Sequence, residues 1–318
     1  MRRHDKRRTQ RLALMPLLLL LGCADDPPID TSGAPSGCSR DDAFDQDALQ
    51  ADLAWLASVE LDGRAPGSPG DAAARDFVEA RLSCLGLSTT IQAFTDDAGN
   101  DTANVLAIIP GTGLADEVVV VTAHLDHFGG GFLGANDNAS GLAGLLAIAH
   151  AMRDDVPRRT VVLAAVASEE QGFEGSRYLL AHPPPGIDPD GIVFNVNLDM
   201  IGSYRQTGTV YALGALSGTY SKTVVKGLEG AYAGLDISYN WGSAESDNAT
   251  FCREGIPYLF LWTEDPDCYH DDCDTADRID YSHLSQIAGL AGAVAAEAAS
   301  TTTDLAGQVR PGVNVCED

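Results

Sequence analysis

The stretch that decides the fold is "EVVVVTAHLDHFGGGFLGANDNASG", residues 117–141. It opens with the largely apolar run "EVVVVTA" over 117–123, which is typical of a strand buried on both faces. The run ends directly in His124, and acidic, amide and glycine residues follow before a segment with helical spacing begins. A buried strand that ends in this much polar chemistry indicates either a solvated loop or a metal site.

Short apolar runs of the same kind recur along the chain, and helical stretches separate several of them. The runs are "ANVLAIIP" (103–110), "TVVLAAVA" (160–167), "GIVFNVNL" (191–198) and "PYLFLW" (257–262). Apolar spacing predicts helices over 47–59, 71–86, 140–153 and 282–300, with Gly86 ending the second and Ser282 capping the last. This alternation predicts an α/β fold, a single-domain α/β/α sandwich with a mixed, largely parallel central sheet.

The N-terminal segment is expected to lie outside that domain. Residues 1–22 join a basic stretch to an apolar run too short to span a membrane stably, as in a signal peptide. The run ends at Cys23 and resembles a bacterial lipobox, which implies removal of 1–22 and a lipidated Cys23. The alternative is an ordinary secretory signal. Residues 23–41 are rich in Pro, Gly, Ser and Asp and predict a flexible tether, followed by a folded domain over 42–318.

Charge and cysteine content agree with an exported protein. The formal net charge is −26, which disfavours nucleic acid and anionic membranes as partners. Any membrane attachment would run through Cys23, in the cell envelope (periplasm or outer membrane), or the protein would be extracellular. Six further cysteines favour disulfides in an oxidising compartment. Cys268 and Cys273 are close enough to bridge; thiolate metal ligands in "CYHDDC" are the weaker alternative, and the other cysteines cannot be paired from sequence.

Four of the five predicted strands lead into a side chain that can bind a metal, and Asp137 lies at the start of the helix after the glycine loop. The candidates are His124, Asp137, Glu169-Glu170, Asp199 and His270. Singly, each has an ordinary explanation: Asp137 or Asn138 as a helix cap, Glu169-Glu170 as a solvated helix start, Asp199 as a turn former. Together they fall at one edge of one sheet, where carboxylates repel unless a cation holds them. Histidine with carboxylate suits Zn²⁺, and a carboxylate free to bridge suits two metal ions.

Six motifs in order resemble peptidase family M28, the zinc aminopeptidases, over roughly residues 46–300. They are "AHLDH", "GANDNASG", "SEEQGFEGS", "NLDMIG", "SDNATF" and "CYHDDCDTADRID", and "LDGRAPGSPGD" (61–71) is similar to the family's entry segment. The resemblance implies a zinc-exopeptidase fold and two Zn²⁺ per chain. It makes His124, Asp137 and Asp199 ligands of one zinc, with Asp137 bridging to a second that Glu170 and His270 complete. Glu169 takes the general-base role, and Asp126 orients His124.

The implied activity is co-catalytic two-zinc hydrolysis of the first peptide bond of peptides or proteins with a free N-terminus, by a monomer. One departure is Ser246-Asp247-Asn248, where the family has Ser-Asp-His. That histidine is not a ligand in the pattern, so the departure concerns substrate contacts. Two rivals stay open: a glutaminyl-cyclase-like enzyme with a single zinc, and a non-catalytic binding module of the same fold. No G-x-S-x-G elbow or H-E-x-x-H helix supports another hydrolase class.

Overall fold

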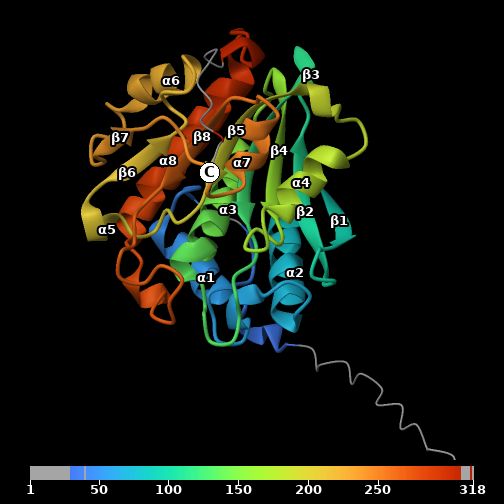
Figure 1. Cartoon of the computed structure of the whole chain (residues 1–318), viewed down its shortest axis with the longest axis vertical. Coiled ribbons are helices and arrows are strands. Elements are labelled where there is room, and N and C mark those ends of the chain that lie inside the picture. The colour runs from blue at the N-terminus through green and yellow to red at the C-terminus, as the bar shows by residue number, and fades with distance from the viewer. Residues whose placement is uncertain (1–28, 39–40, 309–315, 317–318) are drawn as a thin grey trace, which may run out of the picture.

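The computed structural model describes residues 29–38, 41–308 and 316, and all five predicted strands lie in one eight-stranded sheet (Figure 1). The strands are β1 Ser88–Thr95, β2 Asp101–Ile109, β3 Leu114–His124, β4 Arg159–Val166, β5 Ile192–Leu198, β6 Val210–Leu213, β7 Ile237–Tyr239 and β8 Tyr258–Trp262. Their order is β1-β2-β4-β3-β5-β8-β6-β7. Sequence reasoning missed β1, β6 and β7, which are short or half-exposed and carry no continuous apolar run.

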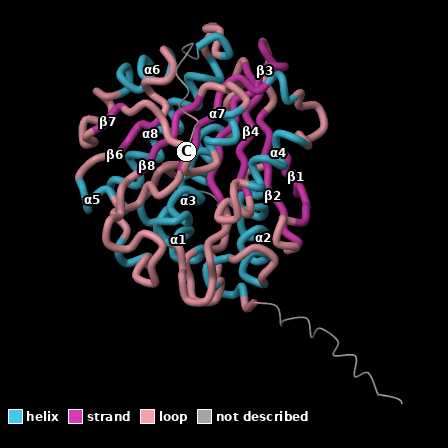
Figure 2. The backbone as a smooth tube through the Cα atoms, in the orientation of Figure 1, coloured by secondary structure: helices cyan, strands magenta, loops and turns pink. Residues whose placement is uncertain are grey.

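The centre of the sheet is parallel, and this places the polar residues together. Strand β3 pairs in parallel with β4 and β5, and β5 pairs in parallel with β8, whereas β2 and β6 join antiparallel. In this register His124 lies opposite Val166, so both strands end at the same level. The predicted mixed, largely parallel sheet is confirmed. At the carboxyl edge of the sheet, long loops lie around the start of the helix that follows β3, α3 (Gly141–Met152) (Figure 2).

Helices cover both faces of the sheet, as predicted. The helices are α1 Gln46–Leu56, α2 Pro69–Cys84, α3 Gly141–Met152, α4 Glu174–Ala181, α5 Tyr204–Thr207, α6 Tyr220–Leu228, α7 Asn248–Arg253 and α8 Tyr281–Ser300. Helices α1, α2, α3 and α8 bury their apolar sides in the main core, on one face. Leu179 of α4 and Phe251 of α7 pack into a second cluster on the other face. The central strands between them are buried on both sides, which explains their largely apolar runs.

Two helix ends can be compared with their predicted signals. Gly86 lies just beyond α2 in the left-handed region, at φ 80°, and ends the helix as predicted. The predicted cap Ser282 is wrong. Helix α8 begins one residue earlier, and Asp280 caps it by accepting the backbone N–H of His283. The negative charge of a carboxylate is also stabilised by the positive N-terminal end of the helix dipole, whereas a serine hydroxyl carries no charge.

The segment predicted as a flexible tether is fastened to the domain over its described part. Cys38 forms a disulfide with Cys84 at the end of α2. Ile29 and Ala34 pack against the main core, and Thr31–Gly33 form a 3-10 turn. A disulfide and apolar contacts hold this segment, and its polar composition indicates neither of them. The predicted signal peptide, residues 1–22, and Cys23 lie outside the described residues.

The other cysteines among the described residues also pair. Cys252 is bonded to Cys316, and the predicted Cys268–Cys273 disulfide is confirmed. Among the described residues, no helix is both long and apolar enough to cross a membrane.

Candidate metal centre

The predicted ligands come together at the carboxyl edge of the sheet in two groups. His124, the last residue of β3, places Nε2 3.2 Å from Asp137 Oδ1 and 3.2 Å from Asp199 Oδ1. His270, in the loop after β8, places Nε2 3.2 Å from Asp137 Oδ2 and 3.6 Å from Glu170 Oε2. Asp137 belongs to both groups and turns one oxygen toward each. The five residues therefore form two donor sets that share one carboxylate.

This donor arrangement fits two zinc ions. Two atoms that each lie about 2.0–2.1 Å from a tetrahedral Zn²⁺ stand about 3.3 Å apart. The spacings of 3.2 and 3.6 Å between the facing nitrogen and oxygen atoms are close to that value. Imidazole with carboxylate is also the donor chemistry that zinc accepts.

Asp137 is held in place by the residues on either side of it. The carboxylate of Asp274 accepts the backbone N–H groups of Asn136 and Asp137, at 2.7 and 3.0 Å. Asn138 Oδ1 accepts the N–H of Gly141 at the start of α3, and its Nδ2 donates to the carbonyl of Leu198. The helix-capping explanation thus applies to Asn138, whereas the Asp137 side chain is left to face the histidines.

Asp126 contacts both the first donor set and the Glu169-Glu170 turn. His124 Nδ1 donates to the backbone carbonyl of Asp126 at 3.0 Å, while the Asp126 carboxylate lies 3.9 Å from the same nitrogen. This contact leaves His124 Nε2 free for a metal. The carboxylate itself accepts the backbone N–H groups of Glu169 and Glu170, at 3.0 and 3.2 Å. Asp126 therefore fixes the turn that carries both glutamates.

Glu169 and Glu170 lie in the turn between β4 and α4, not at the start of the helix. Ser168, just before them, takes the left-handed conformation at φ 55°, which a non-glycine residue rarely adopts. A Glu169 oxygen lies within 4.8 Å of donor atoms of His124 and Asp199. Glu169 could by proximity be a ligand. Asp137 Oδ1 lies 3.2 Å from His124 Nε2, so both carboxylates are close to that donor set.

Three further residues organise the site, and sequence reasoning assigned them no role. They are Arg64, His127 and Asp274. The Arg64 side chain is fully buried and donates to the carbonyls of Leu125, Leu133 and Gly134, and to that of Leu56. It thereby clamps both ends of the loop that follows His124. All three lie inside the quoted motifs, so position within a motif was the available signal.

The triple glycine in 129–131 forms a turn tied to the segment before α2. The N–H groups of Gly130 and Gly131 donate to the Asp62 carboxylate at 3.1 and 2.8 Å. A Cβ placed on Gly129 would meet Ala65 and Asp62, and none of the metal donors. These contacts anchor the glycine turn as a rim of the site.

The site concentrates buried negative charge. Buried carboxyl groups here are Asp126, Asp137, Glu169, Asp199, Asp247 and Asp274, and the Glu170 side chain is 6 % exposed. Burial raises the pKa of Glu170 to about 9, that of Asp247 to about 7 and that of Asp274 to about 6. Arg64 brings one positive charge against them. Bound cations would supply the remaining compensation.

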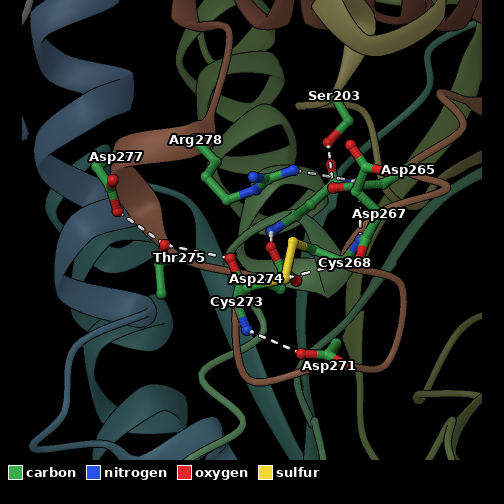
Figure 3. Close-up of a disulfide and its surroundings, with 11 residues drawn as sticks. Ser203, Asp265, Asp267, Cys268, Asp271, Cys273, Asp274, Thr275, Asp277 and Arg278 are labelled. Carbon is green, nitrogen blue, oxygen red and sulfur yellow. Dashed lines mark hydrogen bonds and ion pairs between the residues drawn. A yellow bond between two sulfur atoms is a disulfide. The ribbon is translucent and has the colours of Figure 1, made fainter.

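A disulfide encloses His270. Cys268 and Cys273 are bonded on either side of it, and acidic side chains surround the loop (Figure 3). Asp265 anchors the loop by accepting the N–H of Cys268 and the hydroxyl of Ser203. His270 itself is left-handed at φ 54°, a conformation that costs a non-glycine residue about 1–2 kcal/mol. The cross-link holds this unfavourable backbone where Nε2 faces Asp137.

Comparisons with known proteins agree with this arrangement. Residues 104–295 match peptidase family M28. Leupeptin-inactivating enzyme 1 of Streptomyces exfoliatus is 29% identical over 266 residues, 75% of this chain, which spans 58% of that relative's length. The solved zinc aminopeptidase BSAP of Bacillus subtilis superposes with TM-score 0.72 at 15% identity, covering 87% of this chain and 100% of that one. A glutaminyl cyclase of Bacteroides thetaiotaomicron superposes with TM-score 0.63 at 19% identity, covering 79% and 97%. These two likenesses concern the fold.

Metal removal should destabilise the protein more at pH 8 than at pH 5.5. Carboxyls with a raised pKa bind protons more tightly when folded, so the stability they add is lost as pH rises through those values, here about 6 to 9. Metal ions offset this loss, and they bind better when their ligands are deprotonated. We expect a chelator to lower the melting temperature strongly at pH 8 and weakly at pH 5.5. An equal or larger drop at pH 5.5 would contradict the electrostatic account.

Removal of the Cys268–Cys273 disulfide should weaken the metal held on the His270 side. In a C268A/C273A variant the loop can relax from its left-handed backbone, and recovering about 1–2 kcal/mol on relaxation lowers metal affinity roughly tenfold. Zinc content after dialysis against a graded chelator series measures this. The C38A/C84A variant is the control, since that disulfide lies at the end of α2. Unchanged affinity in C268A/C273A would show that other contacts hold the loop.

Proposed function

The chain belongs to peptidase family M28, and on that premise we propose that it is an aminopeptidase that uses two zinc ions to hydrolyse the first peptide bond of peptides. One observation carries the proposal. The two oxygens of Asp137 face different histidines, His124 and His270, each at 3.2 Å. A glutaminyl-cyclase-like enzyme with a single zinc needs no bridging carboxylate, and a non-catalytic module needs no complete donor set.

His124, Asp137 and Asp199 would hold one ion, and Asp137, Glu170 and His270 the other. When bound, the ions would supply Lewis-acid chemistry that polarises the scissile carbonyl and lowers the pKa of a water toward about 7. The chain's own contribution is proton transfer. Burial raises the pKa of Glu169 well above its ordinary value, against the opposing effect of His124, so its carboxyl can accept a proton and release it again.

In this proposal Glu169 takes the proton from water and passes it to the amine that leaves. Both steps need its carboxyl at the mouth of the site, and Glu169 lines a cavity of about 600 Å³ there together with Asp199 and His270. The Asp126 carboxylate accepts the backbone N–H groups of Glu169 and Glu170, and these hydrogen bonds restrain the position of Glu169. General acid–base catalysis of this kind contributes about 10²–10⁴-fold to the rate.

The same cavity has the character of a binding site for an N-terminal residue. Its apolar wall consists of Met200, Leu213, Phe260 and Trp262. Glu245 and Glu264 add carboxylates to the lining, which suits an ammonium group. We infer that the side chain of the first residue packs on the apolar wall while its free amine lies among the acids.

We also propose that the protein is exported and attached through a lipidated Cys23. The three disulfides support an oxidising compartment, because cytosolic proteins rarely keep them. Labelling with a radioactive fatty acid, compared between wild type and a C23A variant, tests the attachment; label retained in C23A would exclude it.

Cleavage should depend on a free N-terminus. We expect release of the first amino acid from unblocked peptides, no release from their N-acetylated forms, and two zinc ions per chain in the purified protein. Quantitative amino-acid release and elemental analysis measure both. One zinc per chain, with cyclisation of N-terminal glutamine and no hydrolysis, would instead support the cyclase.

Replacing Glu169 should remove turnover and leave the metals in place. For Glu169→Ala we expect kcat/KM to fall by at least about 100-fold, since the base is lost. Zinc content should stay near two per chain, whereas Asp199→Ala and His270→Ala should lose metal. Elemental analysis beside the kinetics separates the two effects. If Glu169→Ala retained most activity, another group would have to be the base.

A further inference from the structure

His127 is a buried histidine that the proposed ligand set leaves unexplained. Its side chain is 0 % exposed, and Nδ1 lies 2.8 Å from Glu170 Oε1 and 3.7 Å from Asp137 Oδ2. His127, Asp137 and Glu170 also place donor atoms within 4.8 Å of one another. By distance alone, this imidazole could either bind a metal or support a residue that does.

The two oxygens of Glu170 distinguish these roles. Oε1 faces His127 at 2.8 Å, which is a hydrogen-bond distance. Oε2 faces His270 at 3.6 Å, a separation suited to two donors on one metal rather than to a hydrogen bond. His127 thus contacts one oxygen of Glu170, while the other oxygen faces His270.

The proton position follows from this contact. A carboxylate that binds a metal is ionised, so its oxygens can only accept hydrogen bonds. With Glu170 as a metal ligand, the 2.8 Å contact therefore places a hydrogen on Nδ1 of His127. Nε2 has no hydrogen-bond partner among the described residues.

The ring cannot easily turn to a different role. Gly134 is left-handed at φ 62°, and a Cβ there would lie 2.7 Å from His127 Cγ. The Phe128 ring covers another side, with its centroid 4.6 Å from that of His127. Packing on both sides fixes the direction of Nδ1–H toward Glu170.

We propose that His127 is a positioning residue for the metal bound by Glu170 and His270: it donates Nδ1–H to Glu170 Oε1 and so presents Oε2 to the metal. The inference rests on the proposed function, since it assumes a metal on that side. Partners that orient a ligand in this way typically contribute 10–100-fold to metal affinity. The metal on the His124 side makes no such use of His127.

Two amide substitutions separate positioning from direct ligation. The Asn amide nitrogen reaches about the place of Nδ1 and can donate to Glu170, whereas the Gln nitrogen reaches about the place of Nε2. His127→Leu removes the donor while keeping an apolar side chain between Gly134 and Phe128. His150→Leu is the matched control, since His150 is buried near the far end of α3 and contacts Arg153. Zinc per chain is measured across a series of zinc-buffered chelators, with near-ultraviolet circular dichroism to monitor folding.

We expect the affinity of one of the two zinc ions to fall 10–100-fold in H127L and H127Q, and to stay near wild type in H127N and H150L. An equal loss in H127N would overturn the proposal, because it would make His127 a direct ligand. Unchanged affinity in H127Q and H127L would also overturn it. If H127L fails to fold, the comparison of H127N with H127Q still decides. A wild type with fewer than two zinc ions would instead remove the premise, and with it the proposed function.

Discussion

The rest of the structure depends on keeping the two oxygens of Asp137 pointed in opposite directions. That carboxylate can serve two donor sets only if the backbone on both sides of it is immobile. The Asp274 carboxylate accepts the backbone N–H groups of Asn136 and Asp137. The next residue, Asn138, is bonded through its side chain to the start of α3 and to the end of β5. Arg64 fixes the loop upstream by donating to the carbonyls of Leu125, Leu133 and Gly134. Much of the polar chemistry of this loop therefore serves geometry rather than catalysis.

Sequence reasoning found the parts of the fold that are buried on both sides and missed those that are not. The runs that became β3, β4 and β5 are largely apolar, because helices cover both faces of the sheet. Strand β7 is half-buried and three residues long, so no pattern could mark it. The segment at 29–38 was predicted as a tether because its composition is polar, yet a disulfide to Cys84 holds it. Composition reports propensity and carries no information about a distant covalent partner.

The candidate site follows the same division. His124 and Asp199 directly follow apolar strands, so strand order alone places them at one edge. Neighbours such as Asp137 and Asn138, or His124 and His127, have different roles because their side chains face different partners. Spacing cannot settle that, since the difference between a helix cap and a metal donor here is one residue in the same loop. A resemblance to a family supplied these assignments where local pattern could not.

The two donor sets are not equivalent, and the supporting contacts are distributed accordingly. His124 is 1 % exposed, and the parallel strands on both sides of β3 hold it rigidly. His270 is 34 % exposed and lies on a loop in a left-handed conformation. On that side stand the Cys268–Cys273 disulfide and the contact from His127 to Glu170. A ligand on a regular strand needs little help, whereas one on a loop must have its backbone and its neighbour's carboxylate restrained.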